Sequence, residues 1–140
     1  MLYLFEPDKQ WEKPLYYTFR DFGDQVRFYG TALGEESKAG CARLDDVIPS
    51  IWNKRGFLKM DVDGPEVKVL RGGKRLLREN RMKCSICAYH NPDDEFRIKA
   101  LLHRCGYRTS ISSGYMVLIY DPDIWERADF RRGMVYGDKI

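Results

Sequence analysis

The chain has 140 residues, of which 44% are hydrophobic and 32% are charged, and its 24 Lys and Arg against 21 Asp and Glu give a net charge of +3. This length predicts about one domain, and the composition excludes a disordered or collagen-like chain. The small net charge also excludes a strongly basic protein of the kind that binds nucleic acid through its overall charge.

The N-terminal part of the chain has the pattern of short strands around one helix. An apolar run at residues 2–5 that stops at Glu6 predicts a strand, and an alternating run at residues 25–29 predicts a second one. Between them, apolar side chains spaced four apart predict a helix over residues 9–22. Residues 42–48 are predicted to form a short strand or a turn.

The centre of the chain carries the clearest strand-to-helix unit. Residues 56–62 are an apolar strand, and Pro65 suits the first turn of a helix because its missing N–H would be unpaired there. The helix then passes through Gly72 and Gly73, each of which weakens it by about 1 kcal/mol relative to alanine. We therefore expect close packing or a kink at this glycine pair.

The remaining elements complete an alternating pattern. Residues 83–89 predict a strand, and Asn91 is placed to cap the helix that follows it. Residues 107–112 and 115–120 predict two strands joined as a hairpin across Ser113-Gly114.

The order of elements predicts an α/β layer sandwich with a mostly parallel sheet and a closing antiparallel hairpin. We expect one domain over residues 1–120 and a C-terminal tail, residues 121–140, packed on it. In such sheets ligands bind outside the carboxyl ends of the strands, so residues at those ends are the candidate site.

Three candidate residues follow the first two strands. Glu6 can accept hydrogen bonds from both hydroxyls of a ribose, as an acid at a strand end does in nucleotide sites, but a solvated acid explains it as well. Thr31 and Ala32 follow the next strand, where their backbone groups can face an adenine ring; a plain turn is the alternative.

The remaining candidates are acids at the central strand-to-helix corner and one histidine. Asp61, Asp63 and Glu66 lie within six residues, where a helix dipole stabilises acids without any ligand, although Asp61 can also meet a cationic group. His90 closes the next strand and is a candidate general base, because imidazole titrates near neutrality, although a single histidine is more often structural.

The cysteines and apolar runs indicate the compartment. Cys84 and Cys87 have a C-x-x-C spacing, but in a strand they point to opposite faces, and no second pair completes a zinc set. We therefore expect buried, reduced cysteines in a cytoplasmic protein and no metal site. No apolar run approaches the ~18 residues that span a bilayer, so we expect no membrane contact.

Residues 68–83 carry seven Lys or Arg, which predicts a basic helix face. Such a face is usually solvated, and this one lacks the interleaved exposed aromatic residues of a nucleic-acid site. We therefore do not expect nucleic acid as a partner.

Five motifs resemble the FkbM family of S-adenosylmethionine-dependent methyltransferases: YLFEPD, RFYGTALGEES, ARLDDVI, FLKMDVDGPEVKVLRGGKRLL and CAYHNPDDEFRIKALLHRCGY. The resemblance covers roughly residues 2 to 120 and implies a Rossmann-like class I methyltransferase sandwich that methylates an oxygen atom of a sugar or another small metabolite.

The resemblance also implies roles for the candidate residues. Glu6, Thr31, Ala32 and Asp61 would bind the cofactor S-adenosylmethionine, Asp61 and His90 would be catalytic, and Asp63, Glu66 and His90 would bind the substrate.

The resemblance begins at the second strand of the family's sheet, downstream of its glycine-rich loop, so we expect an N-terminal truncation. Two alternative functions stay open: a non-catalytic interaction module that kept the fold, and another enzyme with a nucleotide cofactor, such as a dehydrogenase. Loss of the first strand would leave a sheet edge unpaired, which predicts a homo-oligomer formed through that edge.

Overall fold

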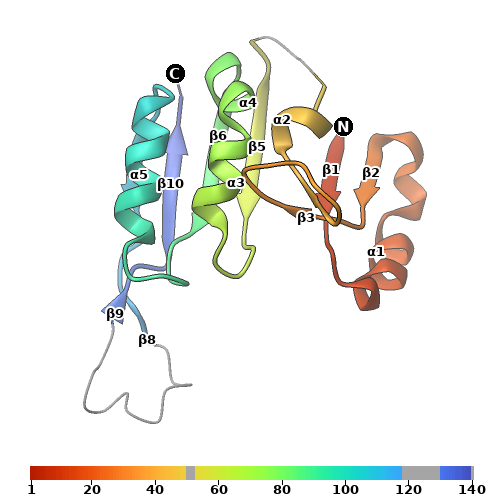
Figure 1. Ribbon diagram of the computed structural model, residues 1–140, viewed down its shortest axis with the longest axis horizontal. Helices are drawn as coiled ribbons and strands as arrows, with labels where there is room; N and C mark the ends of the chain where they lie inside the picture. The colour runs from red at the N-terminus through yellow and green to blue at the C-terminus, as the bar shows by residue number, and fades with distance from the viewer. Residues whose placement is uncertain (50–52, 118–129, 140) are drawn as a thin grey trace.

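The computed structural model describes residues 1–49, 53–117 and 130–139 (Figure 1). The elements in chain order are β1 (Leu2–Phe5), η1 (Lys9–Trp11), α1 (Glu12–Phe19), η2 (Arg20–Gln25), β2 (Val26–Tyr29), β3 (Ala32–Leu33), β4 (Cys41–Ala42), α2 (Leu44–Val47), β5 (Arg55–Met60), α3 (Glu66–Gly72), α4 (Lys74–Glu79), β6 (Arg81–Cys87), α5 (Asp94–Arg104), β7 (Arg108–Ile111), β8 (Met116–Val117), β9 (Phe130–Arg131) and β10 (Met134–Asp138). None of the described helices is long and apolar enough to cross a membrane.

The main sheet has four strands in the order β5-β6-β10-β7. Strands β5 and β6 run parallel, whereas β10 is antiparallel to both of its neighbours and pairs Val135 with Ile86 on one side and with Ile111 on the other. The α/β class is therefore confirmed, but the main sheet is mixed rather than mostly parallel. The antiparallel strand comes from residues 134–138, within the segment expected to be a tail.

The predicted hairpin across Ser113-Gly114 is wrong, because the two strands on either side of this turn do not pair with each other. Strand β7 pairs with β10, and β8 pairs with β9, so the chain before and the chain after residues 118–129 form one antiparallel ribbon. Residues 118–120 of the predicted second hairpin strand lie outside the described residues. The pairing of β7 with β10 is favoured over the predicted hairpin because it places the completely buried Val135 between Ile86 of β6 and Ile111 of β7.

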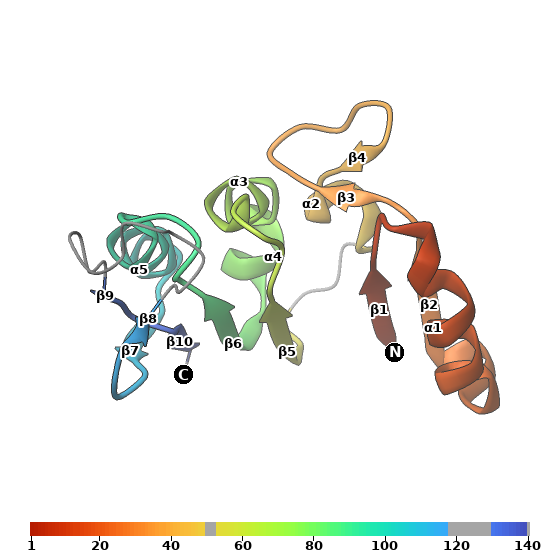
Figure 2. The ribbon, with the colours of Figure 1, turned by 90° about the horizontal axis from the view of Figure 1, so that it is seen from below.

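Strands β1 and β2 form a separate parallel pair, and β1 runs in the same direction as β5 (Figure 1). No backbone pairing joins β1 to β5 in the described structure, so each has one edge without a strand partner. Helix α1 lies beside β2, away from α3 and α5 (Figure 2). The pair contributes Tyr3 and Phe5 to the outside of the core.

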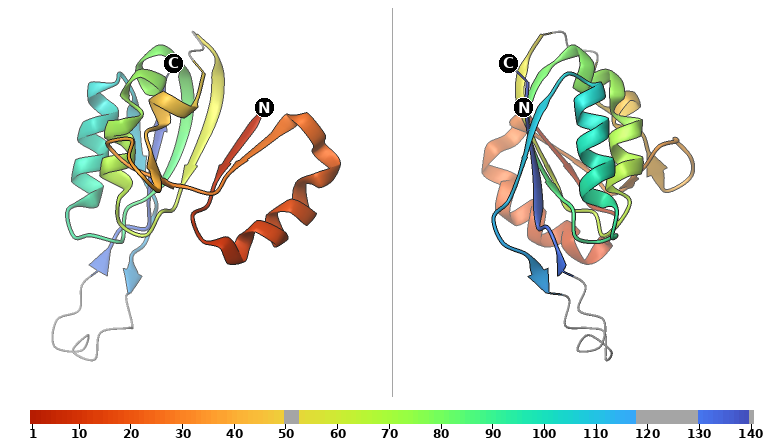
Figure 3. Two further views of the ribbon diagram at one scale, coloured as in Figure 1. Left: turned by 45° about the vertical axis from the view of Figure 1, so that its right-hand side comes forward. Right: turned by 90° about the vertical axis from the view of Figure 1, so that its left-hand side faces the viewer.

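Helices α3, α4 and α5 all cover one face of the main sheet (Figures 2 and 3). They bury Leu70, Leu77 and Ile98 against Ile86 and Val135, each at 1% exposure or less. Within the described part of the chain no helix covers the opposite face, so the expected third layer is missing there.

The glycine pair confirms the predicted close packing and kink. A Cβ on Gly72 would lie 2.1 Å from the carbonyl oxygen of Gly34, which only a glycine permits. Gly73 separates α3 from α4. Helix α3 therefore lies directly against the loop that follows β3.

Two local predictions are wrong. Residues 42–48 contain the short helix α2, in which Asp45 accepts hydrogen bonds from the backbone N–H groups of Arg75 and Leu76. Asn91 does not cap α5, which begins at Asp94; its backbone and side-chain nitrogens instead donate to the buried Asp94 carboxylate. In both cases an acid accepts the hydrogen bonds: Asp45 from the start of α4, about 30 residues away, and Asp94 from the turn just before α5.

Candidate functional site

Four of the candidate residues lie where β5 and β6 end. Asp61 follows β5 directly, Asp63 lies in the turn before α3, Glu66 is the first residue of α3, and His90 follows β6. Because β5 and β6 are parallel, their carboxyl ends share one edge of the sheet, and the four side chains meet there.

A buried carboxylate lies behind the His90 ring. Nδ1 of His90 is 2.7 Å from Oε1 of Glu66, whose side chain has no exposed surface. Nδ1 and Oε1 are in close contact, but the geometry is not that of a well-aligned hydrogen bond. The Glu66 oxygens also accept the backbone N–H groups of Val62 at 3.2 Å and Gly64 at 3.1 Å. Glu66 therefore fixes the turn and orients His90, and its burial corrects the expectation that it contacts substrate.

The other ring nitrogen of His90 faces two acids. Nε2 lies 3.3 Å from Oδ1 of Asp63 and 3.8 Å from Oδ1 of Asp61. The Asp63 side chain is 97% exposed, and its backbone has a left-handed φ of 55°. Asp63 therefore lies at the surface beside Nε2, the ring nitrogen that faces away from the buried Glu66.

Asp61 remains ionised because its neighbours outweigh its burial. Burial acts to raise the pKa of Asp61, but hydrogen bonds from Cys87 and Tyr89 and the charges of Lys59 and His90 bring that pKa below its usual value. The Tyr89 hydroxyl donates to Oδ1 of Asp61 at 3.3 Å, and Nζ of Lys59 lies 3.5 Å from Oδ2. The Asp61 carboxylate is therefore an anion at the sheet edge, in contact with the Tyr89 hydroxyl and the Lys59 ammonium.

Two further residues shape the site and were not predicted. Burial, with the charge of Asp61 adding to it, raises the pKa of Tyr89 to about 12, so the phenol stays a proton donor. The Arg131 guanidinium donates to the carbonyl oxygens of Tyr89 at 2.9 Å and His90 at 2.7 Å. Only its position next to His90 pointed to Tyr89, and Arg131 comes from β9, far along the chain.

The edge also holds the ligand types of a divalent cation. One oxygen each of Asp61 and Asp63 and a ring nitrogen of His90 lie within 4.8 Å of one another. The Lys59 ammonium already pairs with the Asp61 carboxylate. Both aspartates are exposed, and exposed acids often lie close together without an ion between them.

The candidates for the cofactor lie at the ends of β1 and β2. Oε1 of the half-buried Glu6 accepts the N–H of Asp8 at 2.8 Å, while Oε2 forms no hydrogen bond or ion pair with a described residue. Thr31 Oγ1 donates to the Ala32 carbonyl at 3.3 Å, and the Ala32 N–H donates to the carbonyl of Gly40 at 3.2 Å. Glu6 therefore keeps one acceptor for a ribose, whereas the Ala32 backbone is occupied and leaves its methyl group for contact.

Comparison with known proteins gives a family and a fold. The family model described as "Methyltransferase FkbM domain" matches residues 3–109. No curated protein matches the sequence significantly. The chain is similar to the crystal structure of methyltransferase FkbM from Methylobacillus flagellatus KT, with a TM-score of 0.68 and 23% identity over 96% of this chain and 36% of that one.

A second solved structure has the same fold with less similarity. Precorrin-6y C5,15-methyltransferase from Geobacter metallireducens GS-15 gives a TM-score of 0.53 and 12% identity over 99% of this chain and 66% of that one. The chain thus spans about a third of the first structure's length.

Proposed function

Because the chain belongs to the FkbM methyltransferase family, we propose that it transfers a methyl group from S-adenosylmethionine to a hydroxyl group of a sugar or another small metabolite. The observation that carries this proposal is the His90 ring, which lies between the buried Glu66 and the surface acids at the carboxyl edge of the sheet.

The chemistry asks for positioning and a base. When bound, S-adenosylmethionine supplies an electrophilic methyl group on a good leaving group, so the enzyme mainly aligns the acceptor and removes its proton. Nε2 of His90 takes that proton, and Glu66 stabilises the positive ring that results. A general base of this kind contributes about 10²- to 10⁴-fold in rate.

The two aspartates have different roles. Asp61, held as an anion by Lys59 and Tyr89, faces the cationic methionine part of the cofactor. Asp63, almost fully exposed beside Nε2 of His90, contacts the acceptor molecule. Unlike charges across such a site steer a cationic cofactor into place.

The residues of β1 and β2 suit the nucleoside part. Oε2 of Glu6 is open to accept a ribose hydroxyl, and Thr31 with the Ala32 methyl group provides a contact for adenine. These residues and Asp61 follow strands that run in the same direction, so one elongated ligand can touch both groups.

Calorimetric titration with S-adenosylmethionine tests the proposal. We expect the protein to bind this cofactor and Glu6→Ala to weaken binding at least about tenfold, because a hydrogen bond to a charged group contributes roughly 1.5–3 kcal/mol. The exposed Glu36, on the loop after β3, supplies the matched control Glu36→Ala. Equal affinity of the two variants would remove Glu6 from the site, and NADH binding in place of S-adenosylmethionine would favour a dehydrogenase.

We also propose that the chain self-associates through its open strand edges. Strand β1 pairs only with β2 and β5 only with β6 in the described structure, so both present unpaired backbone groups. Light scattering over a range of concentrations should show an oligomer of the wild-type protein. Leu2→Lys on β1 should shift the protein toward the monomer, since a charged side chain on an edge strand blocks pairing with another strand. The control is Phe96→Lys on α5, and a wild-type monomer at high concentration would contradict the proposal.

A further inference from the structure

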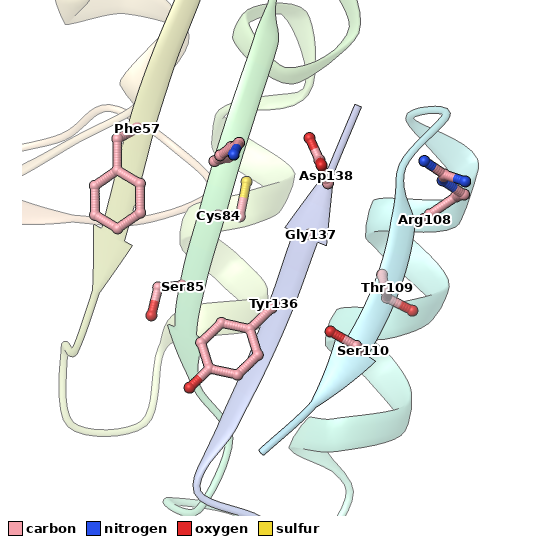
Figure 4. Close-up of a pocket in the computed structure, with 10 residues that line it drawn as sticks. Phe57, Cys84, Ser85, Arg108, Thr109, Ser110, Tyr136, Gly137 and Asp138 are labelled. Atoms are coloured by element: carbon pink, nitrogen blue, oxygen red, sulfur yellow. The ribbon is translucent and has the colours of Figure 1, made fainter. Parts of the chain in front are cut away.

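On the side away from α3, α4 and α5, the main sheet has a face that none of the described helices covers. Because side chains alternate along a strand, every second residue of β5, β6, β10 and β7 points to this face. Figure 4 shows Phe57, Ser85, Tyr136 and Arg108 on it, around a shallow depression of about 400 Å³. These residues come from four different strands and form one continuous surface.

The open face is strongly basic. It carries five exposed cations, one on β7 and two each on β5 and β6: Arg55, Lys59, Arg81, Lys83 and Arg108. Asp138 is its one exposed acid within the described residues. Of the five cations only Lys59, which contacts Asp61, forms an ion pair with a described residue. Asp138 is the register partner of both Lys83 and Arg108, so the face carries an excess of positive charge that this acid and Asp61 offset only in part.

Two of these cations are placed directly against each other. Arg55 of β5 is the register partner of Arg81 of β6, so like charges lie opposite one another on adjacent strands. Like charges directly opposite one another destabilise a sheet. The register thus concentrates positive charge at the start of β5 and β6, where an anionic ligand is attracted.

Two exposed aromatic rings lie among the cations. Phe57 is 65% exposed and Tyr136 is 41% exposed. Phe57 pairs across the sheet with Lys83, and Tyr136 pairs with Ser85, so β6 places a cation and a hydroxyl between the two rings. Apolar rings exposed to water in this way are available to stack on a planar ligand.

We propose that this face binds single-stranded nucleic acid, with bases stacked on Phe57 and Tyr136 and phosphates on Arg81, Lys83 and Arg108. Rings interleaved with cations on a flat surface are the combination that binds single strands, because every base has a face to stack and every nucleotide a phosphate. The predicted basic helix over residues 68–83 is divided in the structure: its first five cations lie on α3 and α4, which lack this combination, whereas Arg81 and Lys83 lie on β6 and belong to the sheet face.

The same residues argue against a helix as the occupant. A sheet face that packs on helices is apolar, whereas this one carries five charges around two rings. A double helix fits less well, since its base faces are hidden inside the stack. The proposal goes beyond methyl transfer and does not depend on it, because the His90 site lies at the sheet edge.

Fluorescence anisotropy with a labelled oligouridylate of about 12 nucleotides tests the proposal, a length within the site sizes of single-strand binders. We expect binding that weakens as salt rises from about 50 to 200 mM. Phe57→Ala should weaken it at least about fivefold, while Phe57→Tyr should retain it, because stacking needs only the ring. Lys83→Gln should make the salt slope about 0.7 shallower, as expected for one lost phosphate contact.

Matched controls lie on the helical side. Phe96 of α5 is 69% exposed and Lys74 of α4 is exposed, so Phe96→Ala and Lys74→Gln make the same changes away from the face. Circular dichroism of each variant reports whether it is folded. Equal losses in Phe57→Ala and Phe96→Ala, duplex RNA bound as tightly as the single strand, or heparin or polyglutamate bound more tightly than the oligonucleotide would each overturn the proposal.

Discussion

Nδ1 of His90 lies 2.7 Å from the Oε1 atom of Glu66, a carboxyl group without any exposed surface. Removing a carboxylate from water costs several kcal/mol unless other groups compensate for the lost hydration. Here two backbone N–H groups of the turn donate hydrogen bonds to the carboxylate, and the His90 imidazole lies in contact with it without a well-aligned hydrogen bond. The shape of the turn and the orientation of the histidine therefore depend on the same buried acid.

Replacing Glu66 should cost stability far more than replacing its exposed neighbour. Glu66→Gln turns one acceptor into a donor that faces a backbone N–H, which costs about 1–3 kcal/mol of unfolding free energy. Asp63→Asn should change stability by less than about 0.5 kcal/mol, because the side chain is 97% exposed and asparagine tolerates φ near 55°. Urea unfolding measures the free energy of unfolding of both variants, and equal stability of the two would contradict the assigned role of Glu66.

His90→Gln should separate binding from chemistry. Glutamine has no group that titrates near neutrality, so methyl transfer to a panel of sugars and small hydroxylated metabolites should fall about 10²- to 10⁴-fold. Affinity for S-adenosylmethionine should stay within about twofold, since the ring acts on the acceptor. A loss of cofactor affinity with unchanged transfer at saturation would instead place His90 in the cofactor site.

Gly72→Ala should destabilise the protein despite the higher helix propensity of alanine. Its Cβ would lie 2.1 Å from the Gly34 carbonyl oxygen, so α3 or the loop after β3 must move, at a cost of about 1–3 kcal/mol or more. The control is Gly30→Ala, whose Cβ meets only the Phe28 ring at 3.9 Å. Thermal unfolding measures both, and a stabilised Gly72→Ala would show that α3 moves away without cost.

Stability should fall in alkaline solution because of Cys84. Burial, with contributions from Cys105 and Asp138, raises the pKa of the Cys84 thiol to about 12. Below the pKa of the unfolded cysteine, roughly 8.5, both states hold the proton and stability is complete. Above it only the folded state does, so the free energy of unfolding falls by up to about 1.4 kcal/mol per pH unit until the pH passes the folded value.

Urea unfolding at a series of pH values measures this dependence. Cys84→Ala should fall less steeply above pH ~9 than the wild type, while Cys41→Ala, outside the core, should keep the wild-type slope. An unchanged slope in Cys84→Ala would assign the alkaline loss to other groups.

Local patterns predicted the strands at residues 2–5 and 56–62, because each apolar run contributes side chains to the core: Tyr3 and Phe5 from β1, and Leu58 and Met60 from β5. They did not predict β10, whose sequence MVYGD is short and contains Gly137, and whose place between β6 and β7 depends on partners about 50 and 25 residues away. The burial of Glu66 was also beyond reach, since a sequence shows an acid near a helix start and not the three donors that surround it.

The missing backbone ladder between β1 and β5 has a consequence for how the molecule opens. The β1-β2 pair is joined to the rest by side-chain packing of Tyr3 and Phe5, without strand hydrogen bonds, so its amide protons should exchange at a lower opening energy than those of β6. A ligand that contacts Glu6 after β1 and Asp61 after β5 would link the β1-β2 pair to the main sheet. Binding would then be recorded as slowed exchange in β1, before any product forms.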